Sequence, residues 1–151
     1  MRACRAELTD IPGWLVLAAE VEELFESRMS IDPAFERILQ RHVDRGTAWV
    51  VREADGPAGG AIIGAAIWRP GPREIAWLAV AERHRRTGVG SCLLRAMFEV
   101  AGSGPVSVVS FRSDAPGGRP ARLFYEAAGF RRAGPATDET APSPREVFVR
   151  P

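Results

Sequence analysis

The stretch that most constrains this chain is residues 75–94, which read IAWLAVAERHRRTGVGSCLL. An apolar run gives way to the cationic cluster at 83–86, then to Gly88-Val89-Gly90, and a helical pattern follows. This order predicts a strand, a glycine-containing loop and a helix. Such a loop presents backbone N–H groups at the positive end of the helix dipole, and arginine side chains match phosphate oxygens. The stretch therefore predicts a site for a diphosphate group.

Two common phosphate-binding motifs do not fit this loop. The P-loop requires a lysine after its second glycine, and the chain contains no lysine. The dinucleotide-binding fingerprint requires a third glycine where this chain has Leu93, and no acidic residue stands where the ribose contact is expected. Neither motif therefore describes this loop.

Composition narrows the class of protein further. A length of 151 residues predicts a single domain, residues 1–151, and a net charge of +1 argues against a nucleic-acid or membrane partner. We find neither a signal peptide nor an apolar run long enough to span a bilayer. Two cysteines make no disulfide framework and no metal site, so we expect no metal and a reducing cytoplasm.

The rest of the chain predicts one mixed sheet flanked by helices. Hydrophobic periodicity and turn residues place strands at 2–5, 47–52, 60–68, 74–80, 106–111, after Phe130, and at 146–150. Caps and prolines place helices from Thr9 or Asp10 to about 25, from Pro33 to Gly46, from Val89 to Gly102, and from Pro120 to Gly129. A turn is expected at Asp55-Gly56-Pro57, and loops at 113–118 and 135–144.

Two motifs carry a resemblance to a known family. The first is Arg85-x-x-Gly88-x-Gly90 after the strand at 74–80, and the second is ARLFYEAAGF at 121–130, with one strand between them. In this order they resemble the GNAT superfamily of acyl-CoA-dependent N-acetyltransferases, and the opening at 6–12 is similar to a frequent family start. The resemblance covers nearly the whole chain. It implies a mostly antiparallel central sheet of about six to seven strands with about four helices.

The resemblance also implies how acetyl-CoA is held as the acyl donor. The pyrophosphate would rest on the loop, whose binding residues are Arg85, Arg86, Thr87, Gly88, Val89, Gly90 and Ser91. The pantetheine arm would pair with the strand backbone at Leu78, Ala79 and Val80, and the Leu78 N–H would polarise the thioester carbonyl. The alternative is a tight strand-to-helix turn with solvated arginines.

Two residues are implied as catalytic. Tyr125, the only tyrosine, aligns with a frequent general acid that protonates the departing thiolate. Glu74 aligns with a glutamate that serves some members as general base for the acceptor ammonium. The alternatives are an aromatic residue packed on its helix and a solvated turn residue beside Arg73.

The sequence departs from the family pattern at two positions. Gly118 stands where many members have an asparagine that contacts the pantetheine, and Glu82 stands where a proline is common. The first departure puts one coenzyme contact and the local loop path in doubt.

We therefore expect an N-acetyltransferase that moves an acetyl group from acetyl-CoA to a primary amine by direct attack in a ternary complex. The acceptor is a small molecule or a peptide amine. Acidic residues at 20–26 and at Asp138 and Glu139 weakly favour a cationic one. Alternatives are a coenzyme A-binding sensor without catalysis and a transferase of a longer acyl group. Whether the chain forms a homodimer stays open.

Overall fold

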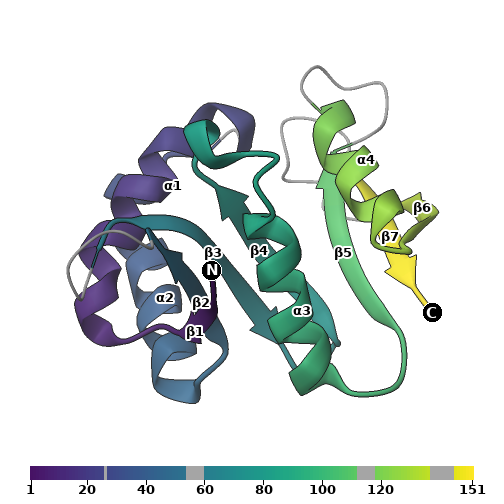
Figure 1. Ribbon diagram of the computed structural model, residues 1–151, viewed down its shortest axis with the longest axis horizontal. Helices are drawn as coiled ribbons and strands as arrows, with labels where there is room; N and C mark the ends of the chain where they lie inside the picture. Colours follow the sequence, from purple (N-terminus) through teal and green to yellow (C-terminus); the bar gives the residue numbers. More distant parts are fainter. Residues whose placement is uncertain (26, 54–59, 112–117, 137–144) are drawn as a thin grey trace. The chain divides into compact units, whose positions relative to one another are not determined.

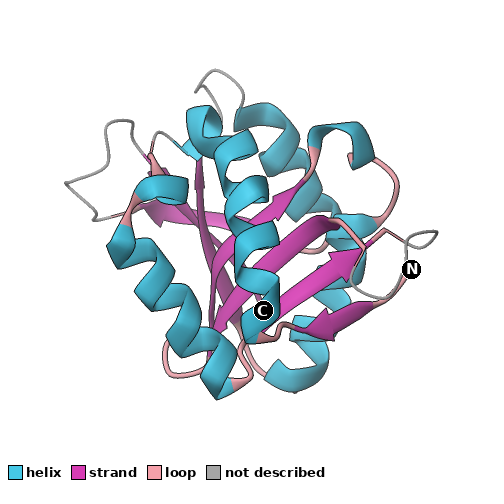
Figure 2. Ribbon diagram, turned by 90° about the vertical axis from the view of Figure 1, so that its left-hand side faces the viewer, coloured by secondary structure: helices cyan, strands magenta, loops and turns pink. Residues whose placement is uncertain are grey.

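The computed structural model of the protein describes residues 1–25, 27–53, 60–111, 118–136 and 145–151. In this part of the chain, seven strands form one mixed, mostly antiparallel sheet in the order β1-β2-β3-β4-β5-β7-β6, accompanied by four α-helices. Figure 2 distinguishes the helices from the strands by colour. The expected fold class is confirmed. The chain divides into two compact units, residues 1–68 with 77–100, and residues 69–76 with 101–151.

The first unit contains the N-terminal strands, three helices and the second half of β4 (Figure 1). Its elements are β1 Ala3–Arg5, α1 Ile11–Phe25, α2 Pro33–Arg45, β2 Ala48–Arg52, β3 Ile62–Arg69, β4 Glu74–Val80 and α3 Val89–Ala101. β2 pairs antiparallel with both β1 and β3, and α2 contacts α1 and β2.

Local sequence signals explain where α2 begins and ends. The Asp32 carboxylate accepts a hydrogen bond from the Ala34 N–H at 2.9 Å, and Pro33 occupies the first turn. Gly46 ends the helix at φ 72°, a left-handed conformation that glycine adopts without strain. Asp10 was one of two residues expected to cap α1. Its carboxylate instead accepts a hydrogen bond from the upstream Glu7 N–H at 2.8 Å and forms an ion pair with Arg52. It therefore closes a short 3₁₀ turn, Leu8–Asp10, before α1.

The core of the first unit is built around Trp77 of β4. Its ring lies 5.5 Å from the rings of Trp14 and Phe25 and 6.1 Å from that of Phe35, centroid to centroid. Its indole N–H donates to the Met29 sulfur at 3.2 Å. Trp77 thus fixes β4 to both α1 and α2, and its side chain is committed to packing.

Helix α3 buries one stripe of its side chains. The buried side chains are Val89, Leu93, Leu94 and Met97. Cys92 is half-buried and Val100 is 44% exposed. The stripe therefore passes through Leu94, which the i, i+3, i+4 pattern also allows.

The second unit holds β5 Val106–Phe111, α4 Gly118–Ala127, β6 Arg131–Pro135, β7 Arg145–Arg150 and the first residues of β4. β7 pairs antiparallel with both β5 and β6, and β4 pairs parallel with β5 at Glu74↔Ser107 and Ile75↔Val108. Helix α4 contacts β5, and Phe130 and Phe148 are fully buried. α4 begins at Gly118, two residues before the predicted Pro120, and Gly129 follows it at φ 95°. The predicted turn at 55–57 and most of both predicted loops lie outside the described residues.

Arg73 stabilises the connection from residue 101 to 105. Its guanidinium donates to the carbonyls of Ala101 at 3.0 Å, Ser103 at 3.1 Å and Pro105 at 2.8 Å. The residue also holds φ at 55°, a conformation that costs free energy for a residue with a Cβ. Three charge-assisted hydrogen bonds offset this cost.

We expect Arg73→Ala to lower the free energy of unfolding by about 2 kcal/mol or more, because three carbonyls lose a charged donor. Chemical denaturation followed by circular dichroism measures the change. Arg69→Ala is the matched control, since Arg69 is 53% exposed and makes a single ion pair with Glu74 at 3.3 Å. Its expected cost is below about 1 kcal/mol. Equal effects of the two variants would contradict this role of Arg73.

Candidate active site

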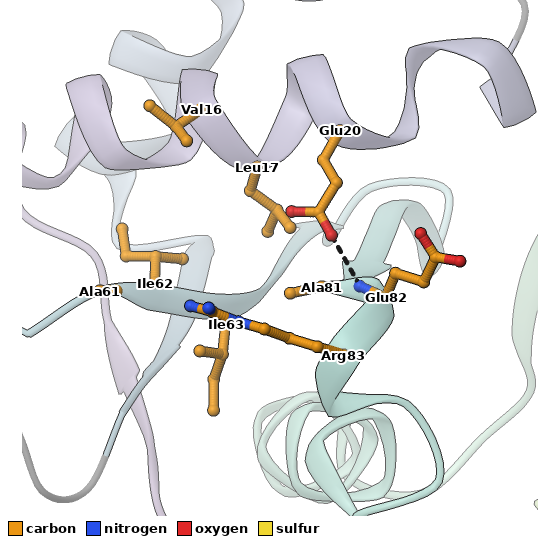
Figure 3. Close-up of a pocket in the computed structure, with 9 residues that line it drawn as sticks. All are labelled: Val16, Leu17, Glu20, Ala61, Ile62, Ile63, Ala81, Glu82 and Arg83. Atoms are coloured by element: carbon orange, nitrogen blue, oxygen red, sulfur yellow. Dashed lines mark hydrogen bonds between the residues drawn. The ribbon is translucent and has the colours of Figure 1, made fainter.

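The loop between β4 and α3 starts from two fixed points in the first unit. The Ala81 N–H donates to the Ile63 carbonyl at 2.8 Å, and the Glu82 N–H donates to the Glu20 carboxylate of α1 at 2.8 Å (Figure 3). A single 3₁₀ turn, Glu82–His84, follows. Both anchors are tertiary, because they come from residues far away in the sequence.

Hydrogen bonds within the loop then use its first amides. His84 N–H donates to the Ala81 carbonyl at 2.9 Å and Arg85 N–H to the Glu82 carbonyl at 3.2 Å. The Thr87 hydroxyl donates to the His84 carbonyl. The path of the loop is therefore set before any ligand binds.

The amides from residue 86 to 91 are in a different situation. The first hydrogen bond of α3 runs from the Cys92 N–H to the Gly88 carbonyl at 3.0 Å. Within the described chain, the amides of Arg86, Thr87, Gly88, Val89, Gly90 and Ser91 have no recorded backbone acceptor. Amides left over at a helix N-terminus, with the helix dipole behind them, favour an anion.

Two residues with positive φ shape this part of the loop. Arg86 has φ 62° and Gly88 has φ 91°. A Cβ built on Gly88 would meet no atom within 4 Å, so this face of the loop opens to space that a ligand can fill. The loop therefore fits a diphosphate, with Arg83, Arg85 and Arg86 exposed around it.

His84 does not belong to this anion site. Its Nε2 lies 3.4 Å from the Glu53 carboxylate, and its side chain is mostly buried.

Strand β4 presents its coenzyme-facing candidates in alternation. Trp77 and Ala79 are buried, whereas Leu78 and Val80 are half-buried on the other face. Ala79 can therefore contribute to binding only through its backbone. The register of β4 with β5 comprises Glu74 and Ile75, and Leu78, Ala79 and Val80 lie beyond it.

Tyr125 lies in the second unit, on the buried side of α4. It is 6% exposed, and its ring stands edge-on to those of Phe124 at 5.1 Å and Phe130 at 5.4 Å. Burial raises the pKa of the Tyr125 phenol above its ordinary value, because the phenolate would lose solvation. The phenol therefore stays protonated throughout the neutral range, although a raised pKa also makes it a weaker proton donor.

Glu74 also lies in the second unit, at the start of β4. Its carboxylate is 3.3 Å from the Arg69 guanidinium, and its side chain is 25% exposed. Its cationic neighbour is therefore Arg69, because the guanidinium of Arg73 is occupied by three carbonyls. The Glu74 carboxylate is accessible to solvent. If it accepts a proton from the amine, it does so while it is the ion-pair partner of Arg69.

A pocket of about 400 Å³ lies in the first unit beside the start of the loop (Figure 3). Val16 and Leu17 of α1 line it from one side and Ile62 of β3 from the other (Figure 3). Glu20, Glu82 and Arg83 contribute the charged groups, and the Glu20 carboxylate accepts a hydrogen bond from the Glu82 N–H.

Sequence reasoning missed a buried carboxylate in the second unit. The Glu146 side chain is 4% exposed and lies 2.9 Å from the Arg132 Nε, across the β6–β7 pair. Glu146 is also paired with the buried Ser110 on β5. The available signal was alternation, because Glu146 shares the inward face of β7 with Phe148.

The described residues contain no group of histidine, cysteine, aspartate and glutamate side chains that could hold a metal ion. No described helix combines the length and the apolar character needed to cross a membrane.

Comparison with known proteins places this fold and loop in a family. A family model described as an acetyltransferase (GNAT) domain matches residues 44–132, more than half of the chain. An acetyltransferase of the GNAT family from Bacillus cereus is 16% identical with a TM-score of 0.75, covering 98% of this chain and 94% of its own. Ard1 from Thermoplasma volcanium is 23% identical with a TM-score of 0.75, covering 98% and 95%.

The ribosomal-protein-S18-alanine N-acetyltransferase from Escherichia coli is 19% identical with a TM-score of 0.68, covering 99% of this chain and 92% of its own. A comparison with curated proteins gave no match. At these identities the structures establish the fold, and the family model covers both the β4 strand and the loop that follows it. The chain belongs to the GNAT acetyltransferase family.

Proposed function

We propose that this protein transfers an acetyl group from acetyl-CoA to a primary amine, and that its two units together form one acetyltransferase domain spanning residues 1–151. The observation that carries the proposal is the run of six amides from 86 to 91 for which the described residues show no backbone acceptor in good hydrogen-bond geometry, beside the open face of Gly88. Family membership supports acyl transfer, and the loop geometry supports a diphosphate-bearing donor.

The donor would be held by the backbone of two neighbouring segments. The loop amides and the side chains of Arg85 and Arg86 receive the pyrophosphate, and β4 pairs with the pantetheine arm through Leu78, Ala79 and Val80. Because Leu78 and Val80 are half-buried, their side chains help to cover the arm. The Leu78 N–H then donates to the thioester oxygen as negative charge develops on it.

The transfer itself needs one proton donor and one proton acceptor. The amine nitrogen attacks the thioester carbon, the new C–N bond forms, and the C–S bond breaks. Tyr125 gives its proton to the departing thiolate, and Glu74 accepts the proton that the amine loses, directly or through water. Most of the rate acceleration comes from holding amine and thioester together.

The acceptor class is only partly constrained by charge. The Glu22 carboxylate accepts from the Ser30 N–H at 2.8 Å and from the Ser30 hydroxyl, and these bonds lower the pKa of Glu22. Glu20 is bonded to the Glu82 N–H. Two of the acidic residues on α1 therefore have structural partners, and the proposed cationic acceptor rests on Glu23 and on residues outside the described ranges.

A panel of primary amines, assayed for free coenzyme A thiol in the presence of acetyl-CoA, tests the function directly. We expect amine-dependent thiol release. Binding of coenzyme A without release for any amine would favour the alternative of a coenzyme A-binding sensor. Faster release from longer acyl donors would favour a different acyl specificity.

Glu74→Gln is expected to reduce kcat/KM about tenfold near neutral pH if Glu74 is the base, since the amide cannot accept the amine proton. The loss should shrink as the pH approaches about 10, where the free amine is abundant without help. A pH profile of the variant beside the wild type measures this. A loss that is independent of pH would instead assign Glu74 a structural role with Arg69.

A further inference from the structure

Gly64 of β3 lies beneath the first turn of α3. It is buried, and a Cβ built on it would come within 2.4 Å of the Val89 Cγ1 and 3.3 Å of the Leu93 Cδ1. It would also lie 3.5 Å from the Ala79 carbonyl of β4. Side chains of α3 therefore pack directly against the backbone of β3 at Gly64.

Space, and not backbone conformation, accounts for this glycine. Gly64 is not among the glycines with positive φ, and it pairs with Val51 of β2, directly before the register between the two antiparallel strands shifts at Arg52. An alanine could adopt the same backbone angles. An alanine side chain would, however, not fit in the present distance between α3 and β3.

The contacting side chains cannot easily yield. Val89 is 1% exposed and Leu93 is fully buried, so neither has room to move into solvent. Val89 is also β-branched and therefore restricted to few rotamers in a helix. We expect a methyl group at position 64 to displace Val89 and, with it, the first turn of α3.

The first turn of α3 carries the amides that the proposed function assigns to the pyrophosphate. Val89, Gly90 and Ser91 belong to it, and Gly88 directly precedes it. The other end of the loop is held by the Ile63 carbonyl on the Ala81 N–H and by the Glu20 carboxylate on the Glu82 N–H, and neither contact passes through α3. A shift of α3 would therefore spread the amides apart, because one end of the loop moves and the other does not.

We propose that Gly64 is a positioning residue for coenzyme binding: its missing side chain seats α3 so that the loop amides converge on one diphosphate. This inference rests on the proposed function. Gly64 lies outside the loop motif, on strand β3, which comes before β4 and the loop in the sequence.

The test is isothermal titration of the full-length chain with coenzyme A, for the wild type, Gly64→Ala, and Gly64→Ala/Val89→Ala. We expect Gly64→Ala to weaken binding about tenfold or more, from overpacking at the Val89 contact. The double variant should recover most of the affinity, because it removes the Val89 Cγ1 and keeps the backbone amide. Steady-state assays should show a raised KM for acetyl-CoA with a kcat within about twofold of wild type.

Gly71→Ala is the matched control, since a Cβ there meets no atom within 4 Å, and its affinity should equal that of the wild type. If Gly64→Ala does not yield folded protein, Val89→Ile applies a milder overpacking from the helix side and should weaken binding about threefold. Wild-type protein without affinity for coenzyme A would overturn the proposed function. Wild-type affinity that persists unchanged in Gly64→Ala, or in Val89→Ile where that variant replaces it, would overturn the role of Gly64 alone.

Discussion

Gly88→Asp is expected to abolish detectable coenzyme A binding. A Cβ at residue 88 would meet no atom within 4 Å, so we expect the new carboxylate to occupy the volume proposed for the pyrophosphate. It would also repel the phosphates at short range and accept hydrogen bonds from the amides that they need. Titration calorimetry with coenzyme A measures the loss, which should exceed about a hundredfold, or ~2.7 kcal/mol.

The control for this variant must separate charge from backbone strain. Any residue with a Cβ at φ 91° is strained, so Gly88→Asp should lower the melting temperature. Gly88→Asn introduces nearly the same volume and a similar strain without the charge. We expect Gly88→Asn to retain measurable affinity and to melt within a few degrees of Gly88→Asp. Equal loss of binding in both variants would show that strain, and not anion repulsion, explains the effect.

Tyr125→Phe is expected to lower kcat about a hundredfold while leaving coenzyme A affinity within about twofold of the wild type. Phenylalanine keeps the ring contacts with Phe124 and Phe130, so the second unit should remain folded. Only the hydroxyl is lost, and with it the proton for the departing thiolate. Single-turnover release of thiol, with the amine saturating, isolates the step that should slow.

The raised pKa of Tyr125 supplies a second measurement. A phenol with an ordinary pKa would lose its proton near pH 10, and the rate would fall there. Burial stabilises the neutral form, so the wild-type rate should show no such decline at pH 10. Unchanged turnover in Tyr125→Phe would remove the hydroxyl from the mechanism, and Tyr125 would then be a core aromatic residue only.

Local sequence signals predicted most of the elements, because those signals act within a few residues. Asp32 and Gly46 bound α2, and Gly129 follows α4, each through backbone geometry that the side chain itself permits. The strand, loop and helix at 75–94 follow from a change in hydrophobic period at the cationic cluster. The start of α4 at Gly118 was missed, because we took Pro120 as the first residue of the helix and it is the third.

The assignment of Tyr125 and Glu74 came from motif positions, and their chemistry remains a prediction. The structure added the surroundings that decide such chemistry. Burial among two aromatic rings keeps the Tyr125 phenol protonated. The sequence did not predict the ion pair between Glu74 and Arg69. Arg73 is the nearer arginine along the chain, but its guanidinium donates to backbone carbonyls between residues 101 and 105.

The sequence by itself determined that this chain carries a glycine loop between an apolar strand and a helix, since glycine, arginine and hydrophobic period act locally. Only the tertiary structure decided what supports that loop. The Glu20 carboxylate accepts a hydrogen bond from the Glu82 N–H, 62 residues away in the sequence. Gly64 of β3 leaves the space that the Val89 side chain of α3 occupies. Such contacts depend on strand register and helix height, and a shift of either by one residue would replace every partner.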